Sequence, residues 1–302
     1  MNIEVAIPTY NRNLYLSKLL STIPADIKVY VSDNGSCVSD DVVRKYPNAT
    51  FIKHSVVLDV FENWNAAAKQ SSSEWLVIPS DDDLFLPEAF QQIEYYTNKY
   101  AEADMLIFGH QIIDENDVVK YKWQPDSEEI MNAPTGFLKF RFGVEARMPS
   151  IVFKTSLLRQ LNYFDEHLKL TAGDSDLVQR GLLHGKAIFI PVIIGAYRVW
   201  NGGLTNKKIA TKLWLDEIDY WQNKVVGLLK ERVLQGWVLP GALSFDQIKD
   251  EVYARNLSAG LYSILKSDNG SRKNRVAFIR QNRFPWRATL KSKMRIIYQI
   301  IK

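Results

Sequence analysis

The first 110 residues alternate short apolar runs with amphipathic segments, and this alternation constrains the fold most strongly. Segments 13–23 and 87–99 carry apolar residues at helical spacing. Strands that alternate with helices in this way predict βαβ units and a mostly parallel, twisted α/β sheet flanked by helices. The apolar runs of strand length are residues 3–7, 27–32, 50–53, 75–79 and 103–113.

The pattern changes twice further along the chain. From about residue 115 to 205 the pattern is less regular, with an expected strand at 118–123, helices at 155–161 and from Asp174, and a strand pair over 187–200. From residue 207 onward the pattern is helical, chiefly over 210–234 and 245–265. We therefore expect a sheet domain over residues 1–205, with halves 1–110 and 111–205. A helical region follows over 206–302.

Composition excludes several classes of protein. With 46% apolar and 24% charged residues among 302, the chain is neither disordered nor fibrous. Its single cysteine, Cys37, excludes a disulfide framework and a cysteine-based zinc site. The longest apolar stretch, 187–197, contains Pro191 and is too short to span a bilayer. The first residues lack the basic and apolar segments of a secretory signal, so we expect a cytoplasmic protein.

The net charge of +4 hides an acidic body and a basic tail. Residues 272–302 hold ten Lys and Arg and no acid, which leaves 28 basic and 34 acidic residues before them. Basic residues interleave with aromatic and aliphatic ones, and Ile296, Ile297, Ile300 and Ile301 share a helical face. This pattern predicts peripheral attachment to an anionic membrane at its inner face. An ordinary packed helix is the alternative, and nucleic acid is not expected because no RNA-binding motif is present.

Polar clusters follow three of the expected strands. In an open parallel sheet, ligands bind at the carboxyl ends of the strands. A carboxylate there can bind ribose or a base, and adjacent carboxylates need a cation such as Mg²⁺ or Mn²⁺ to neutralise them. An ordinary loop, a turn and a helix cap are the structural alternatives. The clusters are Pro8-Thr9-Tyr10-Asn11-Arg12, Asp33-Asn34-Gly35-Ser36 and Ser80-Asp81-Asp82-Asp83.

Two later positions also invite a chemical interpretation. Asp174 and Asp176 open an expected helix, where one of them can act as a general base that deprotonates an acceptor hydroxyl. They can equally cap that helix and complement its dipole. Arg198, at the end of the last strand, can contact a diphosphate or form a structural ion pair.

Taken together, the motifs PTYNR, SDNGS and SDDDLFLP resemble those of family 2 glycosyltransferases with the GT-A fold, over about residues 3–200. The resemblance implies an inverting transfer of sugar from a nucleotide-diphosphate donor to a glycan or lipid-linked acceptor in bacterial surface polysaccharide synthesis. It assigns Asp81, Asp82 and Asp83 to a DXD-type site for Mn²⁺ or Mg²⁺, and Asp174 or Asp176 to the base. The implied nucleotide-sugar contacts are Pro8, Thr9, Tyr10, Arg12, Asp33, Asn34, Asp81 and Arg198.

Two positions depart from the family pattern. Ser80 stands where the family often has its first aspartate, which favours Asp82 for direct metal contact. Relatives often place a histidine near the position of Trp200, so no third protein ligand is expected here. A nucleotidyltransferase of related fold is an alternative, although PTYNRN lacks the glycine-rich loop that such enzymes use. A non-catalytic glycan-binding relative is another.

Overall fold

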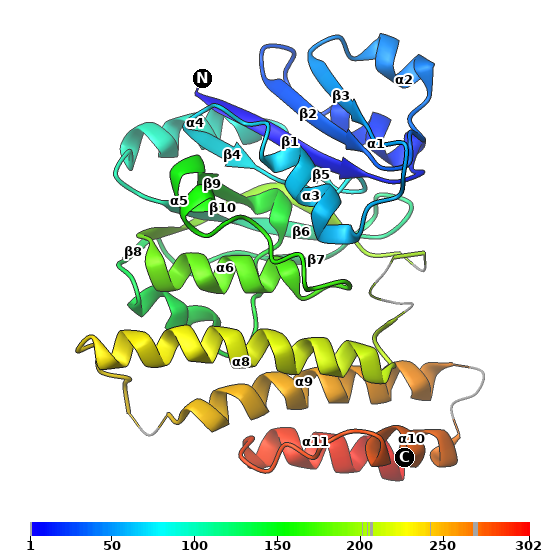
Figure 1. Cartoon of the computed structure of the whole chain (residues 1–302), viewed down its shortest axis with the longest axis vertical. Helices are drawn as coiled ribbons and strands as arrows, with labels where there is room; N and C mark the ends of the chain where they lie inside the picture. Colours follow the sequence, from blue (N-terminus) through cyan, green and yellow to red (C-terminus); the bar gives the residue numbers. More distant parts are fainter. Residues whose placement is uncertain (1, 201, 204, 206–207, 242, 268–270) are drawn as a thin grey trace.

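The N-terminal part of the computed structural model consists of the expected strand and helix units (Figure 1). The structure describes all residues except 1, 201, 204, 206–207, 242 and 268–270. Each expected strand and helix of the first 110 residues is present, with ends that differ by no more than three residues. The elements are β1 (Ile3–Thr9), α1 (Asn13–Leu20), β2 (Lys28–Asp33), α2 (Asp40–Lys45), β3 (Ala49–Lys53), α3 (Val60–Ala68), β4 (Trp75–Val77), α4 (Ala89–Lys99) and β6 (Met105–Ile113).

The middle of the chain adds short strands that the sequence pattern does not reveal. Strands of two to four residues carry too few side chains to display a period of two. Three of them, β5, β8 and β9, were not expected. The elements are β5 (Leu84–Phe85), β7 (Val119–Trp123), β8 (Glu129–Met131), the 3-10 helices η1 (Thr135–Phe140) and η2 (Met148–Ser150), β9 (Ile151–Lys154), α5 (Thr155–Gln160), α6 (Gly173–His184) and β10 (Ala187–Arg198).

All strands join one ten-stranded sheet with the order β3-β2-β1-β4-β9-β6-β10-β5, and β7 and β8 pair with β6 and β10. The half formed by β3, β2, β1 and β4 is parallel, as expected. The other half is mixed, because β9 lies antiparallel to both β4 and β6, whereas β6 and β10 are parallel. The parallel half therefore brings the loops after β1, β2 and β4 to one edge.

The strand pair expected over residues 187–200 is wrong, since this segment is the single strand β10. Its pairing with β6 shifts register between Phe189 and Ile193 and again between Ile193 and Gly195. Pro191 lies in the first irregularity, where a residue without a backbone N–H is tolerated. The strand thus bends without ending, and its last residues pair with β5, directly after the Asp81–Asp83 segment.

Four helices at the C-terminal end form the lower layers of the molecule in Figure 1: α8 (Lys212–Leu234), α9 (Phe245–Lys266), α10 (Arg272–Arg280) and α11 (Leu290–Ile301). Each begins after a Ser or Thr whose hydroxyl accepts a backbone N–H of the first turn. The boundary expected at 205/206 adjoins residues outside the described part. Among the described helices, none is long and apolar enough to cross a membrane.

Two apolar clusters cover the faces of the sheet. Alternate residues of β1 point to opposite faces, so Val5 and Ile7 join the cluster with α1, α2 and α4, whereas Ala6 joins the other. The second cluster continues through α6 into α8 and α9 and reaches Ile296 of α11. The C-terminal helices are therefore packed on the sheet through a continuous core.

Candidate active site

The loops after β1, β2 and β4 meet at one edge of the sheet. Thr9 and Asp33 are register partners at the ends of β1 and β2, and Asn34 N donates to Thr9 O at 3.0 Å. Across the β1–β4 pair, the Thr9 hydroxyl donates to Asp81 Oδ2 at 2.7 Å. The polar clusters predicted from the sequence are therefore brought together by the parallel half of the sheet.

Asp81 joins the acidic segment to the first loop. Arg12 Nη1 donates to Asp81 Oδ1 at 2.7 Å, and the backbone N–H of Tyr10 lies 3.4 Å from Oδ2. Burial raises the pKa of Asp81 to about 6, and the positive charge of Arg12 opposes that rise. Both oxygens of this carboxylate are thus occupied by partners in the protein.

Asp83 is held by the backbone. Its Oδ2 accepts Ser80 N at 2.9 Å and its Oδ1 accepts Arg198 N at 3.2 Å, which ties the acidic loop to the end of β10. Burial raises the pKa of Asp83, and the negative charge of Asp82 adds to the rise. Asp83 is only 1% exposed, so its buried carboxylate stabilises the conformation of the loop.

Asp82 differs from its neighbours because one of its oxygens is open. Oδ2 accepts Trp200 Nε1 at 2.8 Å and Arg12 Nη1 at 3.2 Å. Oδ1 accepts no hydrogen bond from any described residue. Trp200, which stands near the position where relatives carry a histidine, therefore orients this carboxylate.

The carboxylates of the acidic loop offer few free oxygens to a divalent cation. The described residues contain no group of three His, Cys, Asp or Glu arranged to hold a metal. Mg²⁺ is commonly bound through one or two carboxylates, with substrate phosphates and water completing the octahedron. The open oxygen of Asp82, with Asp81 and Asp83 fixed on either side, fits a cation of this kind. It does not fit an all-protein cage.

The loop after β2 contains a buried carboxylate that is half satisfied. Asp33 Oδ1 accepts Cys37 N at 2.7 Å and Val38 N at 3.1 Å, whereas the buried Oδ2 has no hydrogen-bond partner in the described part of the chain. Asn34 is engaged at both ends, since it accepts Leu58 N at 2.7 Å and donates to Leu58 O at 3.1 Å. Asp33 thus has an acceptor to offer a ligand, and Asn34 braces the loop.

Two other predicted contacts have contrasting environments. Tyr10 is 52% exposed, and its ring lies beside Gly35, where φ is +74° and a larger residue would be strained. Arg198 is buried, donates to Asp82 O and Asp114 O, and forms an ion pair with Asp117. Tyr10 can reach a ligand, whereas Arg198 supports the loops around it.

The two acidic residues at the start of α6 are not equivalent. Asp176 is fully buried, and its Oδ2 lies 2.7 Å from Arg180 Nε and 3.2 Å from Lys224 Nζ. Asp174 is partly exposed, and Oδ1 accepts Ser175 N at 2.6 Å. Burial raises the pKa of Asp174, and the positive charge of Arg147 opposes this. The side chain of Asp174 is therefore the more accessible of the two.

Sequence reasoning missed Arg147 and Tyr197, which link Asp174 to the acidic loop. The Arg147 guanidinium lies over the Tyr197 ring, 5.2 Å from its centroid. Burial raises the pKa of Tyr197, Arg147 opposes this, and Asp83, Asp174 and Asp82 add to it. The Tyr197 ring therefore feels the charge of Asp174 and that of the acidic loop. No sequence signal separates Arg147 from other arginines of the irregular middle region.

A carboxylate from α8 holds the loop that leads into α6. Glu217 Oε2 accepts the backbone N–H groups of Lys169 and Leu170 at 2.6 and 2.8 Å. Its Oε1 accepts those of Thr171 and Ala172 at 2.9 and 3.1 Å. Sequence reasoning also missed these hydrogen bonds, because Glu217 and the loop that it holds lie more than 40 residues apart in the chain. Its effect is to fix the backbone immediately before Gly173 and Asp174.

Gly173 brings the start of α6 against α3. A β-carbon at this position would lie 2.3 Å from Cζ of the Phe61 ring. A larger residue would therefore push α6 away from α3 or displace that buried ring. The glycine directly before Asp174 thus has a packing role.

Comparisons with known proteins agree with this architecture. Residues 4–160 match the family model "Glycosyl transferase family 2". A Haemophilus influenzae protein described as an uncharacterized glycosyltransferase is 23% identical over 183 residues, which are 56% of this chain and 61% of that relative. The match thus spans less than two thirds of the relative's length.

Solved structures resemble the whole chain. S. aureus TarS 1–349 in complex with UDP-GlcNAc is 18% identical, with a TM-score of 0.64. The likeness covers 92% of this chain and 80% of the TarS chain. The mannosyltransferase PcManGT from Pyrobaculum calidifontis, in complex with GDP-Man and Mn²⁺, is 16% identical, with a TM-score of 0.51. The likeness covers 99% of this chain and 87% of PcManGT. This likeness confirms the predicted GT-A fold. Since the family model covers more than half of its length, this chain belongs to glycosyl transferase family 2.

Proposed function

We propose that this protein transfers a sugar from a nucleoside-diphosphate donor to a hydroxyl of a glycan or lipid-linked acceptor, with inversion and with a divalent cation. The product would enter a bacterial cell-surface polysaccharide. The observation that carries the proposal is that Arg12, after β1, and Trp200, after β10, both contact Asp82, after β4, whose Oδ1 accepts no hydrogen bond from a described residue. The charges of Asp174 and of this acidic loop both raise the pKa of Tyr197, which supports a position of Asp174 near the loop.

The donor nucleotide would lie on the loops after β1 and β2. The exposed Tyr10 ring offers a stacking surface for the base, and the unpartnered Oδ2 of Asp33 can accept an imide or ribose proton. Two of the structural relatives bind UDP-GlcNAc and GDP-Man, which supports a nucleoside-diphosphate sugar as the donor class. Neither the base nor the sugar follows from these contacts.

The diphosphate would lie beside the acidic loop. Asp82 would contribute its open oxygen to Mn²⁺ or Mg²⁺, while Asp81 and Asp83 hold the loop in shape. When bound, the cation supplies Lewis-acid neutralisation of the charge that grows on the departing diphosphate. Arg12, which already contacts Asp81 and Asp82, adds a positive charge at the same place.

Asp174 would act as the general base. The acceptor oxygen forms a bond to the anomeric carbon while the bond from that carbon to the diphosphate oxygen breaks on the opposite face. The hydroxyl proton passes to the Asp174 carboxylate. This single displacement inverts the anomeric centre. Asp176 is less suited to the role, because Arg180 and Lys224 already neutralise its buried carboxylate.

The proposal also includes a location at the inner face of the cell membrane. Lipid-linked acceptors are found there, and the tail 272–302 carries the cationic and apolar residues that such a surface attracts. The location is separate from the chemistry, so the two are tested separately.

The test of the chemistry is turnover of a panel of nucleotide sugars with and without Mn²⁺. We expect one donor to be hydrolysed or transferred with release of nucleoside diphosphate, and Asp82→Asn and Asp174→Asn to lose about a hundredfold or more. Asp126→Asn, an exposed carboxylate in the loop after β7, is the matched control. Full turnover in Asp82→Asn would contradict the metal assignment. Release of pyrophosphate from a nucleoside triphosphate would favour a nucleotidyltransferase.

A further inference from the structure

Helix α11 carries an apolar stripe on its outer face. The stripe residues are spaced i, i+4, i+7, i+8 and i+11, which places them on one side of a helix. Trp286, just before the helix, is 74% exposed and extends the stripe. The exposed fractions are 72% for Leu290, 56% for Met294, 40% for Ile297, 61% for Tyr298 and 63% for Ile301.

The opposite face of α11 explains why the stripe points outward. Ile296 is fully buried, Ile300 packs against the same core, and Gln299 Oε1 accepts the hydroxyl of Ser258 on α9 at 2.7 Å. The four isoleucines expected to share one face are therefore divided, since Ile297 and Ile301 are exposed. The helix is fixed by one face and leaves a second apolar face without protein cover.

Positive charge lies beside this stripe, and most of it forms no ion pair with the described residues. Arg283 pairs with Asp219 and Asp250, and Arg275 is buried, so these two serve the fold. Seven others are exposed, and within the described residues none of the seven forms an ion pair: Arg272, Lys273, Arg280, Arg287, Lys291, Arg295 and Lys302.

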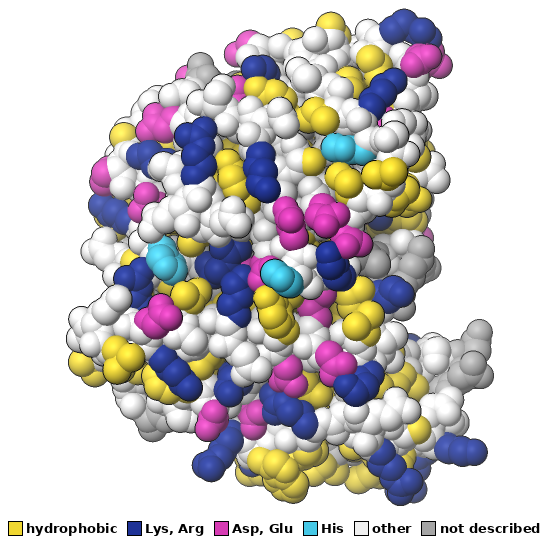
Figure 2. Space-filling view, viewed as in Figure 1, with side chains coloured by type: hydrophobic (Ala, Val, Ile, Leu, Met, Phe, Trp, Pro, Cys, Tyr) yellow, Lys and Arg dark blue, Asp and Glu magenta, His cyan; other side chains and the backbone are white. Residues whose placement is uncertain are grey.

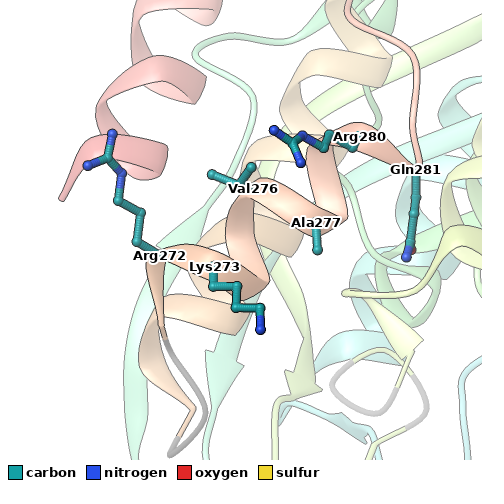
Figure 3. Close-up of a pocket in the computed structure, with 6 residues that line it drawn as sticks. All are labelled: Arg272, Lys273, Val276, Ala277, Arg280 and Gln281. Carbon is teal, nitrogen blue, oxygen red and sulfur yellow. The ribbon is translucent and has the colours of Figure 1, made fainter.

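The arrangement of these charges follows the stripe. Lys291, Arg295 and Lys302 each come directly after a stripe residue, so they line one flank of it. On α10, Arg272, Lys273 and Arg280 line an open depression of 610 Å³, together with Val276 and Ala277 (Figure 3). Figure 2 shows hydrophobic and basic side chains together at this end of the molecule.

Two acids of α9 that contact the segment before α11 are covered. Asp250 accepts Arg287 N at 2.7 Å and Glu251 accepts Thr289 N at 2.9 Å, so the segment before α11 lies over both carboxylates. The outer surface of α10 and α11 therefore presents apolar and cationic groups without competing acids from residues 272–302. Its charge is complementary to a surface of anionic headgroups above an apolar interior.

We infer that the outer surface of α10 and α11 docks in the plane of an anionic lipid bilayer. The stripe and Trp286 would enter the headgroup region, and the seven exposed cations would contact lipid phosphates. The inference rests on the membrane location within the proposed function and is independent of the transfer chemistry. It commits to lipid as the occupant, whereas a second copy of the chain is an outcome of the test.

The test is co-sedimentation of the full chain with vesicles of phosphatidylglycerol and phosphatidylcholine, compared with phosphatidylcholine alone. We expect binding only to the anionic vesicles, and weaker binding as salt rises. Changing Lys291, Arg295 and Lys302 to Gln should reduce affinity about fivefold each, and so about a hundredfold together. Leu290→Ser with Ile301→Ser should reduce it by about tenfold or more.

Matched controls separate this surface from general effects. Lys45, Lys122 and Lys230 are exposed on α2, β7 and α8, and their joint change to Gln should leave vesicle binding intact. Leu234→Ser with Val238→Ser is the control for exposed apolar residues.

Equal binding by the stripe variants, or no binding to anionic vesicles, would overturn the inference. A dimer in solution that Leu290→Ser disperses, without any vesicle binding, would assign the stripe to a second copy instead. Donor turnover is measured on the same variants, so a failure of the chemistry is distinguishable from a failure of docking.

Discussion

The two sides of the candidate site are assembled in different ways. On the donor side, Thr9, Arg12, Asp33 and Asp81 lie at the ends of neighbouring parallel strands, and their hydrogen bonds to described residues stay within the first 110 residues. Only the Arg12 guanidinium, 5.3 Å from the centroid of the Trp200 ring, also touches a later residue among those described. On the acceptor side, the loop before Asp174 is held by Glu217 from α8. The donor side is therefore a property of the sheet, whereas the candidate base depends on the C-terminal helices. Substitutions that affect only one side test this difference.

Apart from the substitutions of Asp82 and Asp174 themselves, the largest expected effect comes from Glu217→Ala. Four backbone N–H groups lose a charged acceptor, so the free energy of unfolding should fall by about 2 kcal/mol or more. Displacement of the loop should lower kcat by about tenfold to a hundredfold, and the donor Kd should stay unchanged. Denaturant unfolding, kinetics and donor titration measure these three quantities.

Asp216 supplies the matched control for Glu217. It is the preceding residue, is exposed and, among the described residues, forms an ion pair only with Lys212 one turn away, an interaction worth about 0.3–0.5 kcal/mol. Asp216→Ala should therefore alter neither stability nor kcat appreciably. Weakened donor binding in Glu217→Ala would show that the two sides are not independent.

Tyr10→Ala should produce the converse result, which is weaker binding of the donor with an unchanged kcat. Loss of the exposed ring beside Gly35 removes a stacking surface for the base, which should raise the nucleotide Kd roughly tenfold. At saturating donor, kcat should be unchanged because the loop before Asp174 is untouched. Tyr121→Ala, which removes an equally exposed ring on β7, is the control in the same titration.

Arg147→Gln should have the smallest effect and act on the base alone. The guanidinium holds the pKa of Asp174 below the value that burial would impose, so its removal raises that pKa. Asp174 accepts a proton only when ionised, and activity is lost as pH falls through its pKa. In a plot of kcat against pH, the acid limb should therefore move to higher pH in Arg147→Gln. It should stay in place in the control variant Arg44→Gln. A shift to lower pH would contradict the proposed role of Asp174.

The donor side was largely predictable from sequence, because most of its contacts join the ends of neighbouring parallel strands. Strand ends that follow one another in the chain become neighbours in a parallel sheet, so Thr9, Asp33 and Asp81 are brought together by local order. The detail that Asp82 keeps the open oxygen depends on Trp200, more than 100 residues away, and no local pattern specifies it.

The acceptor side was predictable only in part. The spacing of Asp176 and Arg180, one helical turn apart, was a visible sign that Asp176 forms an ion pair and that Asp174 is the freer residue. Arg147 and Glu217 reach Asp174 or its loop through tertiary packing, which one sequence does not encode as a motif. Strands of two to four residues, such as β5, were missed because they are too short to show a period.

The most direct test of the central claim is thermal unfolding with UDP and with GDP, in the presence and absence of Mn²⁺. A nucleotide at one hundred times its Kd adds about 2.7 kcal/mol of stability. We predict that one nucleotide stabilises the protein, that Mn²⁺ increases this effect, and that Asp82→Asn removes the increase while Asp126→Asn keeps it. The same Mn²⁺-dependent increase in Asp82→Asn, or no stabilisation by either nucleotide, would contradict the account.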